Sequence, residues 1–531
     1  MAKFESLLWQ PPEALNTKEK AIAKRAAKKR KLFVFLREQR HVIFDESFQH
    51  ELIEMYRQTG AGKVPQAPAR LALLTLLQRY ADVADNEAIE LIIDSNRWQM
   101  VLDTLDDEKP FCCQKTLYDF RMRLQHTGLD QRLLQRSVEV ARERGGFSAK
   151  TLRAALDSSP LWGHGRVEDT INLIGHAGRN VLDCLAALTE HTVAEVIQAI
   201  GLNLFEHKSL KATLDVDWSD GEQKQQALQR LIDEIELLQQ WVQEHLPGES
   251  ERPPLAQALE TLHTVMEQDL EPDPEGGGRR IREGVAKDRR ISIEDAQMRH
   301  GRKSATQRID GYKRHIVRDL DEQLILAAEV QPANRPDKDA LKPLLQDNDL
   351  QGRELQSLHI DRAYLDDSVV PALVTQGVKI VCRAWPSYNS TGLFTKREFQ
   401  IDLAAGQATC PDGVSVAITP GKTAFFPSER CQACTLKAQC TRSKQGRSLA
   451  IHAQEALLQE LGELSSSSVG RAQLRERVDV EHGLAHISQR QGNRARYNGR
   501  RKNTYHLRIS AAIQNLETAQ RLVPQEMAMA A

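Results

Sequence analysis

Apolar residues recur at intervals of three and four positions between residues 49 and 145, with few strand-like alternations among them. This spacing gathers apolar side chains on one face of a helix, so the segment is predicted to be helical. We expect an all-helical domain over residues 49–148, preceded by an arm at residues 1–48. The recurring apolar positions are Leu71, Leu74, Leu77, Leu117, Phe120, Leu124, Leu134 and Val138.

A different pattern begins at residues 152–157, a short apolar run that closes on the carboxylate of Asp157. Residues 158–160, Ser-Ser-Pro, favour turns, so a strand followed by a loop is predicted. Residues 166–290 are again helical in pattern and include a glycine run at 276–278. That run lacks the lysine-containing signature of a phosphate-binding loop, so a flexible linker is the favoured interpretation.

Strand-like runs follow the glycine run. Residues 312–318 and 324–330 are two short runs with the mostly acidic residues 319–322 between them, which is typical of a hairpin. A helix is predicted over residues 336–346, because Pro336 suits a first helical position and acidic residues occupy the first turn.

Two further strands are predicted, one at residues 355–361, which closes on Asp361, and one at residues 378–383. Residues 392–446 show little helical periodicity, and residues 468–489 are helical again. Strands thus alternate with helices through the second part of the chain, which favours an α/β class for it.

The length of 531 residues allows about three or four domains. No run of 18 or more apolar residues occurs, so no membrane span is expected. The first 16 residues lack the basic-then-apolar order of a secretory signal, so we expect them to be retained and the protein to be cytoplasmic.

The net charge of −1 conceals a strong segregation of charge. Residues 213–277 hold sixteen acids against three bases, and such a segment repels the phosphates of DNA. Residues 18–31 carry eight Lys or Arg against one acid and could bind phosphates, although a solvated basic helix is an equal alternative. Residues 490–508 carry seven and no acid, interleaved with Tyr497 and Tyr505, which suits phosphate contact combined with base stacking.

Eight cysteines are too few for a disulfide framework in a chain of this length. Four of them follow a C-x20-C-x2-C-x5-C spacing, and the close pair is half of a structural zinc site. Four free thiols are the alternative. The four are Cys410, Cys431, Cys434 and Cys440, whereas Cys112, Cys113, Cys184 and Cys382 lack metal spacing and are expected in the core.

Five short motifs occur in a fixed order: RHGRKS at 299–304, GYKRH at 311–315, PAN at 332–334, DRAY at 361–364 and RVDVEH at 477–482. In this order they resemble the catalytic core of bacterial insertion-sequence transposases of the DDE type. That resemblance implies a ribonuclease H-like mixed sheet flanked by helices. The expected catalytic domain covers residues 149–516, is interrupted by an acidic helical insertion at 200–290 and a small β-rich cysteine-containing insertion at 390–466, and precedes a tail at 517–531.

The resemblance implies that Asp157, Asp361 and Glu481 bind two Mg²⁺ or Mn²⁺ ions. Phosphodiester cleavage with two metal ions needs carboxylates from distant positions to converge, because magnesium prefers oxygen ligands. Asp157 could instead be a helix cap or turn residue, and Asp295 is its nearest competitor.

Helical spacing puts Glu481 on one face with Leu474, Val478 and Ala485, and we expect that face to point inward. Asp479 points roughly 200° away and is expected to be solvated.

The family's signature around its glutamate, Y-x2-R-x3-E-x6-K, is matched only in part. Arg477 and Glu481 fit, whereas Leu474 and Ser488 stand where tyrosine and lysine are expected. Arg490 could replace the lysine as a phosphate contact, with a surface arginine as the alternative. Trp385 could stack on a flipped base as an aromatic does in such families, but a core tryptophan is the favoured interpretation.

The function implied is a transposase that binds the terminal inverted repeats of its own insertion sequence and cleaves and transfers DNA strands. Its partners would be double-stranded DNA, at the transposon ends and the target, and a second copy in a dimer or higher oligomer, at the bacterial nucleoid. Two alternatives remain: an inactive, zinc-containing DNA-binding derivative, and a structure-selective nuclease of the same fold. The expected DNA-binding residues are Lys28, Lys29, Arg30, Lys31, Lys313, Arg477, Arg490, Arg494, Arg496, Arg500, Arg501 and Lys502.

Overall fold

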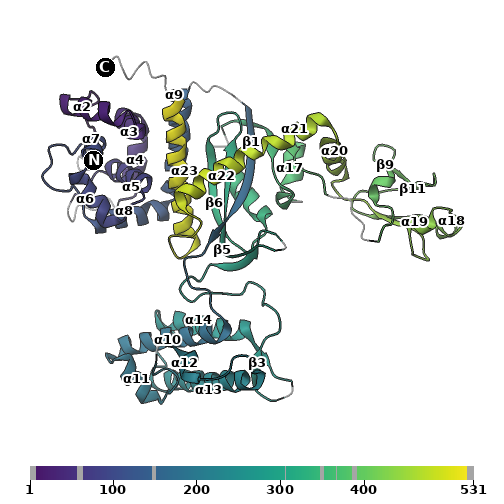
Figure 1. Ribbon diagram of the computed structural model, residues 1–531, viewed down its shortest axis with the longest axis horizontal. Coiled ribbons are helices and arrows are strands. Elements are labelled where there is room, and N and C mark those ends of the chain that lie inside the picture. Colours follow the sequence, from purple (N-terminus) through teal and green to yellow (C-terminus); the bar gives the residue numbers. More distant parts are fainter. Residues whose placement is uncertain are drawn as a thin grey trace.

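The computed structural model describes residues 7–56, 64–145, 151–207, 209–274, 276–304, 306–346, 352–365, 368–385 and 391–522. A central sheet is joined to N-terminal helices, to a helical insertion and to a small β-rich region, which extend from it in three directions (Figure 1). The α/β class predicted from the sequence is confirmed. Across the described ranges, no helix is both long and apolar enough to span a bilayer.

In the N-terminal part, every regular element among the described residues is a helix, as its apolar spacing predicts. Helices already begin at Thr17, inside the expected arm, and Phe33 and Leu36 of that segment are buried in the same core as Leu74 and Phe120. The helices are α2 (Thr17–Ala26), α3 (Lys31–Ile43), α4 (Glu46–Glu54), α5 (Pro68–Ala81), α6 (Asp85–Asp94), α7 (Asn96–Leu102), α8 (Gln114–Thr127) and α9 (Leu129–Gly145).

Six strands form the central sheet in the order β4-β5-β1-β7-β8, with β6 also paired to β5. The long central strand β1 runs antiparallel to β5 on one side and parallel to β7 on the other. A parallel pair leaves both carboxyl ends at the same edge of the sheet. The strands are β1 (Thr151–Trp162), β4 (Arg299–Arg302), β5 (Arg308–Asp319), β6 (Ile325–Pro332), β7 (Glu354–His359) and β8 (Lys379–Val381).

The loop predicted at residues 158–160 is wrong, because β1 continues through Pro160 to Trp162. Pro160 lies opposite Lys313 of β5, whereas the pairing with β7 ends at Ala155. A proline cannot donate to a ladder, so it is tolerated in a strand where one neighbour is missing.

The hairpin predicted at residues 312–330 is confirmed as β5 and β6. The helix predicted over 336–346 forms as a 3₁₀ turn, η1 (Asp337–Ala340), followed by α15 (Leu341–Leu345). The next two predicted strands are β7 and β8, with α17 (Val370–Thr375) between them.

The helical insertion has a hydrophobic core of its own, formed by buried residues from Ile171 to Leu270. This core begins before residue 200, where the sequence places the start of the insertion. The glycine run is not a linker but the turn between two paired strands, and Gly277 and Gly278 adopt positive φ there. The elements are α10 (Thr170–Thr189), α11 (Val193–Ile200), α12 (Leu210–Leu214), α13 (Gly221–His245), α14 (Leu255–Asp269), β2 (Leu270–Pro272) and β3 (Arg279–Ile281).

The cysteine-containing region is built from short strands and turns of helix, in keeping with its weak periodicity. It has a small core that includes Phe399 and Phe426. Its elements are η3 (Lys396–Glu398), β9 (Gln400–Asp402), β10 (Gln407–Thr409), β11 (Ser415–Ala417), β12 (Thr423–Phe425), α18 (Ser428–Ala433), α19 (Lys437–Cys440) and β13 (Ser448–Ala450).

Four helices close the described chain: α20 (Glu455–Ser466), α21 (Ser468–Glu476), α22 (Val478–Gln491) and α23 (Arg500–Leu522). The helix predicted over residues 468–489 is therefore two helices that meet at Arg477. The long helix α23 packs on α9 and β6, between the N-terminal helices and the sheet (Figure 1).

Candidate active site

Two of the expected acids lie level with each other at one edge of the sheet. Ala155 of β1 pairs with His359 of the parallel strand β7. Asp157 and Asp361 each follow two residues later, so both come at the carboxyl-terminal side of this pairing.

Arg477 joins the first acid to the third. Its Nη1 lies 2.9 Å from Oδ2 of Asp157, and its Nη2 donates a 2.8 Å hydrogen bond to Oε1 of Glu481. The arginine occupies the junction between α21 and α22, so one turn of α22 separates it from Glu481. The structure thus brings Asp157 and Glu481 to opposite sides of one guanidinium group.

Burial raises the pKa of Asp157 above its ordinary value. The nearby cations Arg477 and Lys303 and the backbone N–H of Ser158 lower that pKa, while the charge of Glu481 raises it. Burial and the charge of Glu481 thus act on Asp157 in the same direction, against the two cations.

Asp361 begins the 3₁₀ turn η2 (Arg362–Tyr364), and its Oδ1 accepts a 2.6 Å hydrogen bond from the backbone N–H of Arg362. Tyr364, the last residue of this turn, is buried. Burial raises the pKa of the Tyr364 phenol well above its ordinary value, and the charges of Asp337, Asp157 and Asp361 raise it further. Tyr364 therefore lies within electrostatic range of two of the expected acids.

A fourth acid, Asp337, is a residue of this site that the sequence reasoning missed. It accepts a 2.9 Å hydrogen bond from the Ser158 hydroxyl and a 2.6 Å hydrogen bond from Lys313 Nζ. Lys303 was also missed, and its Nζ donates to the carbonyl oxygen of Ser158 at 2.7 Å. The sequence held one signal for each residue. Asp337 lies in the predicted first helical turn after Pro336, and Lys303 belongs to the RHGRKS motif at 299–304.

Lys313, expected to contact DNA, is buried and paired with Asp337. It also donates to the carbonyl oxygen of Arg335. Its contacts hold the turn before η1 against β5, and they give it a structural role.

The orientation predicted for Glu481 is wrong. Its side chain is 48% exposed, and Val478 on the same expected inward face is also exposed. The buried face of α22 is formed instead by Val480, Gly483, Leu484, Ile487 and Gln491. The expected face fails within α22 itself, because the apolar stripe of Val480, Leu484 and Ile487 is the one that packs inward.

Two other acids have structural partners. Asp479 is not solvated as expected, since its Oδ2 lies 3.2 Å from Nε of the buried Arg318. Asp295, the competitor of Asp157, is buried and accepts 2.7 Å hydrogen bonds from the Tyr312 hydroxyl. That contact ties the segment before β4 to β5.

The three expected acids offer oxygen donors that suit Mg²⁺ or Mn²⁺. Within the described residues, however, no three His, Cys, Asp or Glu side chains lie close enough to share one ion. The Arg477 guanidinium stands where Asp157 and Glu481 face each other. The donor chemistry therefore fits a divalent ion, and the arrangement requires Arg477 to release both carboxylates.

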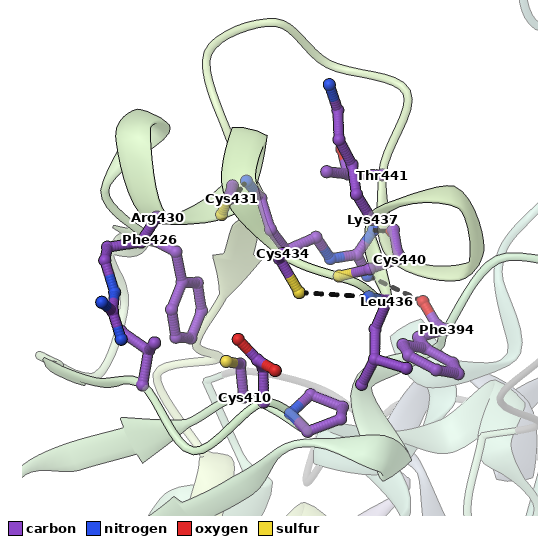
Figure 2. A pocket seen from close by; sticks show the side chains of 14 residues that line it. Phe394, Cys410, Phe426, Arg430, Cys431, Cys434, Leu436, Lys437, Cys440 and Thr441 are labelled. Atoms are coloured by element: carbon purple, nitrogen blue, oxygen red, sulfur yellow. Dashed lines mark hydrogen bonds between the residues drawn. The ribbon is translucent and has the colours of Figure 1, made fainter.

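The four spaced cysteines line one cavity of about 30 Å³ (Figure 2). Cys434 Sγ accepts a 3.3 Å hydrogen bond from the backbone N–H of Leu436, and Cys431 Sγ accepts one from Arg447 at 3.5 Å. Hydrogen bonds to ligand atoms orient them in metal sites. Burial, however, raises the pKa of the Cys434 thiol above its ordinary value, so a bound metal would have to displace its proton. The cavity thus has the donor set of a structural zinc site, although its thiols are not at ligand distances.

The remaining cysteines divide by burial. Cys112 and Cys382 are buried as expected, Cys184 is half-buried, and Cys113 is exposed and outside the core.

Most arginines of the basic segment 490–508 have partners within the chain. Five of them bind carboxylates or carbonyl oxygens of distant elements, and this gives them a structural role. Arg490 binds Glu517, Arg494 binds the carbonyls of Gly163 and His164, Arg496 binds Asp82, and both Arg501 and Arg508 bind the buried Asp130. The side chains of Arg500 and Lys502 remain exposed.

Trp385 is not a core residue, because it is 54% exposed. The Arg362 guanidinium lies over its ring at 5.5 Å, next to Asp361. The exposed ring of Trp385 is accessible for stacking against a base.

One family model matches the chain. It is described as a transposase DDE domain and covers residues 409–519, about a fifth of the chain. The matched segment contains the four spaced cysteines, Arg477 and Glu481, but neither Asp157 nor Asp361. No match was found among curated proteins or among solved structures.

Proposed function

We propose that this chain, which carries a transposase DDE domain, binds the ends of its own insertion sequence and catalyses metal-dependent cleavage and transfer of DNA strands. One observation carries the proposal: Asp157 and Glu481 meet across Arg477, at the sheet edge where Asp361 lies. Convergence of carboxylates from residues more than 300 positions apart is what two-metal phosphodiester chemistry requires.

In this proposal Asp157, Asp361 and Glu481 hold two Mg²⁺ or Mn²⁺ ions. Bound ions would activate the attacking oxygen and stabilise the leaving oxygen of the phosphodiester. Strand β1 and the Ser158 N–H, which donates to Asp157 Oδ1 at 2.8 Å, fix the direction of that carboxylate. Lys303 and Arg477 place positive charge beside the acids, where it favours an approaching phosphate.

No covalent protein intermediate is part of this mechanism. Water nicks the transposon end, and the freed 3′ hydroxyl attacks a second phosphodiester. Joining two ends implies a dimer or higher oligomer. The ribonuclease H-like catalytic core, the role of the N-terminal helices in end recognition, and action at the nucleoid in a bacterial cytoplasm belong to the same proposal.

The proposed structural Zn²⁺ would lie among Cys410, Cys431, Cys434 and Cys440. Four thiolate ligands leave no open position on zinc, so such an ion stabilises the region and takes no part in the reaction.

The deciding experiment incubates the purified chain with Mg²⁺ and a plasmid that carries the gene's own flanking DNA. Wild type should nick at the element ends and give joined products. Asp361→Asn should bind the same DNA but cut at least about 100-fold more slowly, because even outer-shell changes at metal sites cost 10- to 100-fold. Asp94→Asn, an exposed acid on α6, is the matched control and should cut normally.

Each other outcome has a distinct meaning. Cutting without joining would favour the structure-selective nuclease. Binding without metal-dependent cutting would favour the inactive DNA-binding derivative. Normal cutting by Asp361→Asn would remove that residue from the mechanism.

A further inference from the structure

A basic groove of about 660 Å³ lies between the N-terminal helices and the last two helices of the described chain. One wall is the junction of α2 and α3 with the end of α5, and the other wall is formed by α22 and α23. Six cations line it, against two carboxylates from Asp82 and Glu517. The cations are Lys28, Lys29, Lys31, Arg79, Arg490 and Arg521.

Both carboxylates of the groove are already neutralised. Asp82 lies 3.0 Å from Nη2 of Arg79, and Glu517 lies 2.6 Å from Nη2 of Arg490. Among the described residues, Arg521 donates to neutral groups of its own helix, the Glu517 carbonyl and the Thr518 hydroxyl. The groove is therefore left with an excess of positive charge.

The three lysines supply most of that excess. Lys28, Lys29 and Lys31 are exposed, and none forms an ion pair with a carboxylate of the described ranges. Lys18, earlier in the same basic segment, differs from them because its Nζ is paired with Asp106 at 2.8 Å. Exposed cations without a carboxylate partner suit a phosphate ligand.

Helix α22 connects the active site to this groove. Glu481, Ala485 and Gln489 follow one another at four-residue spacing and are all exposed, so they form one solvent-facing stripe. Gln489, with His486, lines the groove. Eight residues of helix span about 12 Å, which is the rise of three to four base-pair steps of duplex DNA.

We infer that this groove binds the phosphate backbone of a DNA strand that leaves the active site along α22. The inference rests on the proposed transposase function, and it adds a second DNA contact formed jointly by the N-terminal helices and the catalytic helix. Contacts to phosphate fix the position of DNA without reading its sequence. The acidic insertion does not interfere, because α13 and α14 lie at the other end of α23 from α2 and α3 (Figure 1).

The first test measures DNA affinity of the full chain against salt concentration, with chelator present so that no cutting occurs. The triple variant Lys28→Gln, Lys29→Gln, Lys31→Gln should make the dependence of log K on log salt less steep by about 2 to 3, because each lost phosphate contact removes about 0.9. The matched control removes three exposed cations of α2 outside the groove, Lys20→Gln, Lys24→Gln and Arg25→Gln, and should keep the wild-type slope.

An equal decrease of the salt slope in the two triple variants would overturn the inference of a binding groove. The whole basic segment would then contribute to DNA affinity without a defined site. The variant Arg521→Gln, on the opposite wall, should reduce the slope by about 1. An unchanged slope for that variant would restrict the contact to one wall and also overturn the inference.

The second test places a photo-crosslinking phenylalanine analogue at Gln489, and at Gln226 on α13 as a control. Position 489 should crosslink to DNA within about three to four nucleotides of the cleaved phosphate, and position 226 should not. Normal cutting without a crosslink at 489 would overturn the groove alone. A wild-type chain that neither binds nor cuts would instead refute the proposed function.

Discussion

Arg477 controls how the acids of the site face one another. Its side chain is 24% exposed, and its planar fork reaches carboxylates from β1 and from α22 at once. Two carboxylates this near would repel each other without a cation between them. Arg477 therefore stabilises the acid pair, and a divalent ion bound at the proposed site would compete with it for the same oxygens.

This competition predicts the behaviour of Arg477→Gln. Mg²⁺ should stabilise the variant against unfolding more than it stabilises wild type, by about 1.4 kcal/mol if its affinity rises tenfold. Thermal unfolding with and without Mg²⁺ measures the difference. Arg475→Gln, an exposed arginine on the preceding helix, is the charge-matched control. Equal Mg²⁺ effects in wild type and both variants would contradict the competition.

Glu19 gives a pH-dependent prediction in the N-terminal core. Its Oε1 accepts a 2.6 Å hydrogen bond from Arg37 Nε, and both side chains are buried. Burial alone would raise the pKa of Glu19, but hydrogen bonds from Arg37 and from the Asn16 backbone bring it below its ordinary value of 4.5. A lowered pKa stabilises the fold above pH 4.5, and that contribution is lost as pH falls below it.

Glu19→Gln should therefore lower the free energy of unfolding by about 3 to 5 kcal/mol at pH 7, because it leaves Arg37 buried without its partner. The gap from wild type should narrow below about pH 4. Denaturant unfolding at pH 7, 5 and 3.5 measures it. Glu54→Gln, an exposed acid on α4, should unfold like wild type throughout. A gap that is constant with pH would show that the ion pair is not its cause.

The sequence shows that Asp157 and Asp361 each close an apolar run, a local signal that needs no tertiary contact, and the family resemblance is what predicts a metal-binding role for them. It cannot identify Asp337 as their neighbour, because the Ser158 hydroxyl that binds Asp337 is 179 positions away. The inward face of Glu481 is misjudged for a different reason. Helix α22 offers two apolar stripes at helical spacing, and the buried one contains Val480, Leu484 and Ile487, not Val478.

At the scale of elements, turn-forming residues give a wrong prediction where pairing with a neighbouring strand outweighs their local preference. Residues 158–160 have the composition of a turn, yet pairing with β5 extends the strand through them. The basic segment 490–508 shows the same limit. Its charge predicts DNA binding. In the fold, however, α23 packs against the N-terminal helices, and the fully buried Asp130 of α9 binds both Arg501 and Arg508 at this contact. Composition gives the charge of a segment but not its partner.

The cysteine-containing region has too small a core to be stable on apolar burial alone. Few hydrophobic residues are fully buried in it, and such small regions usually need a metal or disulfides. Those residues are Phe399, Ala408, Phe426, Leu449 and Ile451.

We therefore expect the purified chain to carry about one zinc ion, and Cys434→Ser to lose it. A strong chelator should make residues 391–451 sensitive to protease while the central sheet stays resistant. Elemental analysis and limited proteolysis measure these effects. Cys113→Ser, at an exposed cysteine outside the cavity, should keep the metal. Metal-free protein with normal protease resistance would support four free thiols.

At the scale of the whole molecule, the helical insertion enters and leaves the sheet at one point. The backbone N–H of Glu168 donates a 3.0 Å hydrogen bond to the carbonyl oxygen of Ile291. Between these residues the chain forms a hydrophobic core separate from that of the sheet. A segment with adjacent ends and its own core behaves as an inserted domain.

Adjacent ends predict that the insertion can be removed without unfolding the rest. Joining Glu168 to Ile291 through a short Gly-Ser linker should not expose any part of the central core. The circular dichroism spectrum should therefore show a folded chain, and its Mg²⁺-dependent cutting should persist.

Deleting residues 213–277 instead, the acidic stretch visible in the sequence, should cause aggregation. That deletion removes α13 and α14 and exposes the buried face of α10, including Leu173 and Val181. Size-exclusion chromatography separates the two results. Faster cutting after clean removal would show that the insertion restrains the active site, and loss of dimers would show that it joins two copies. An unfolded product would show that the sheet depends on the insertion for its stability.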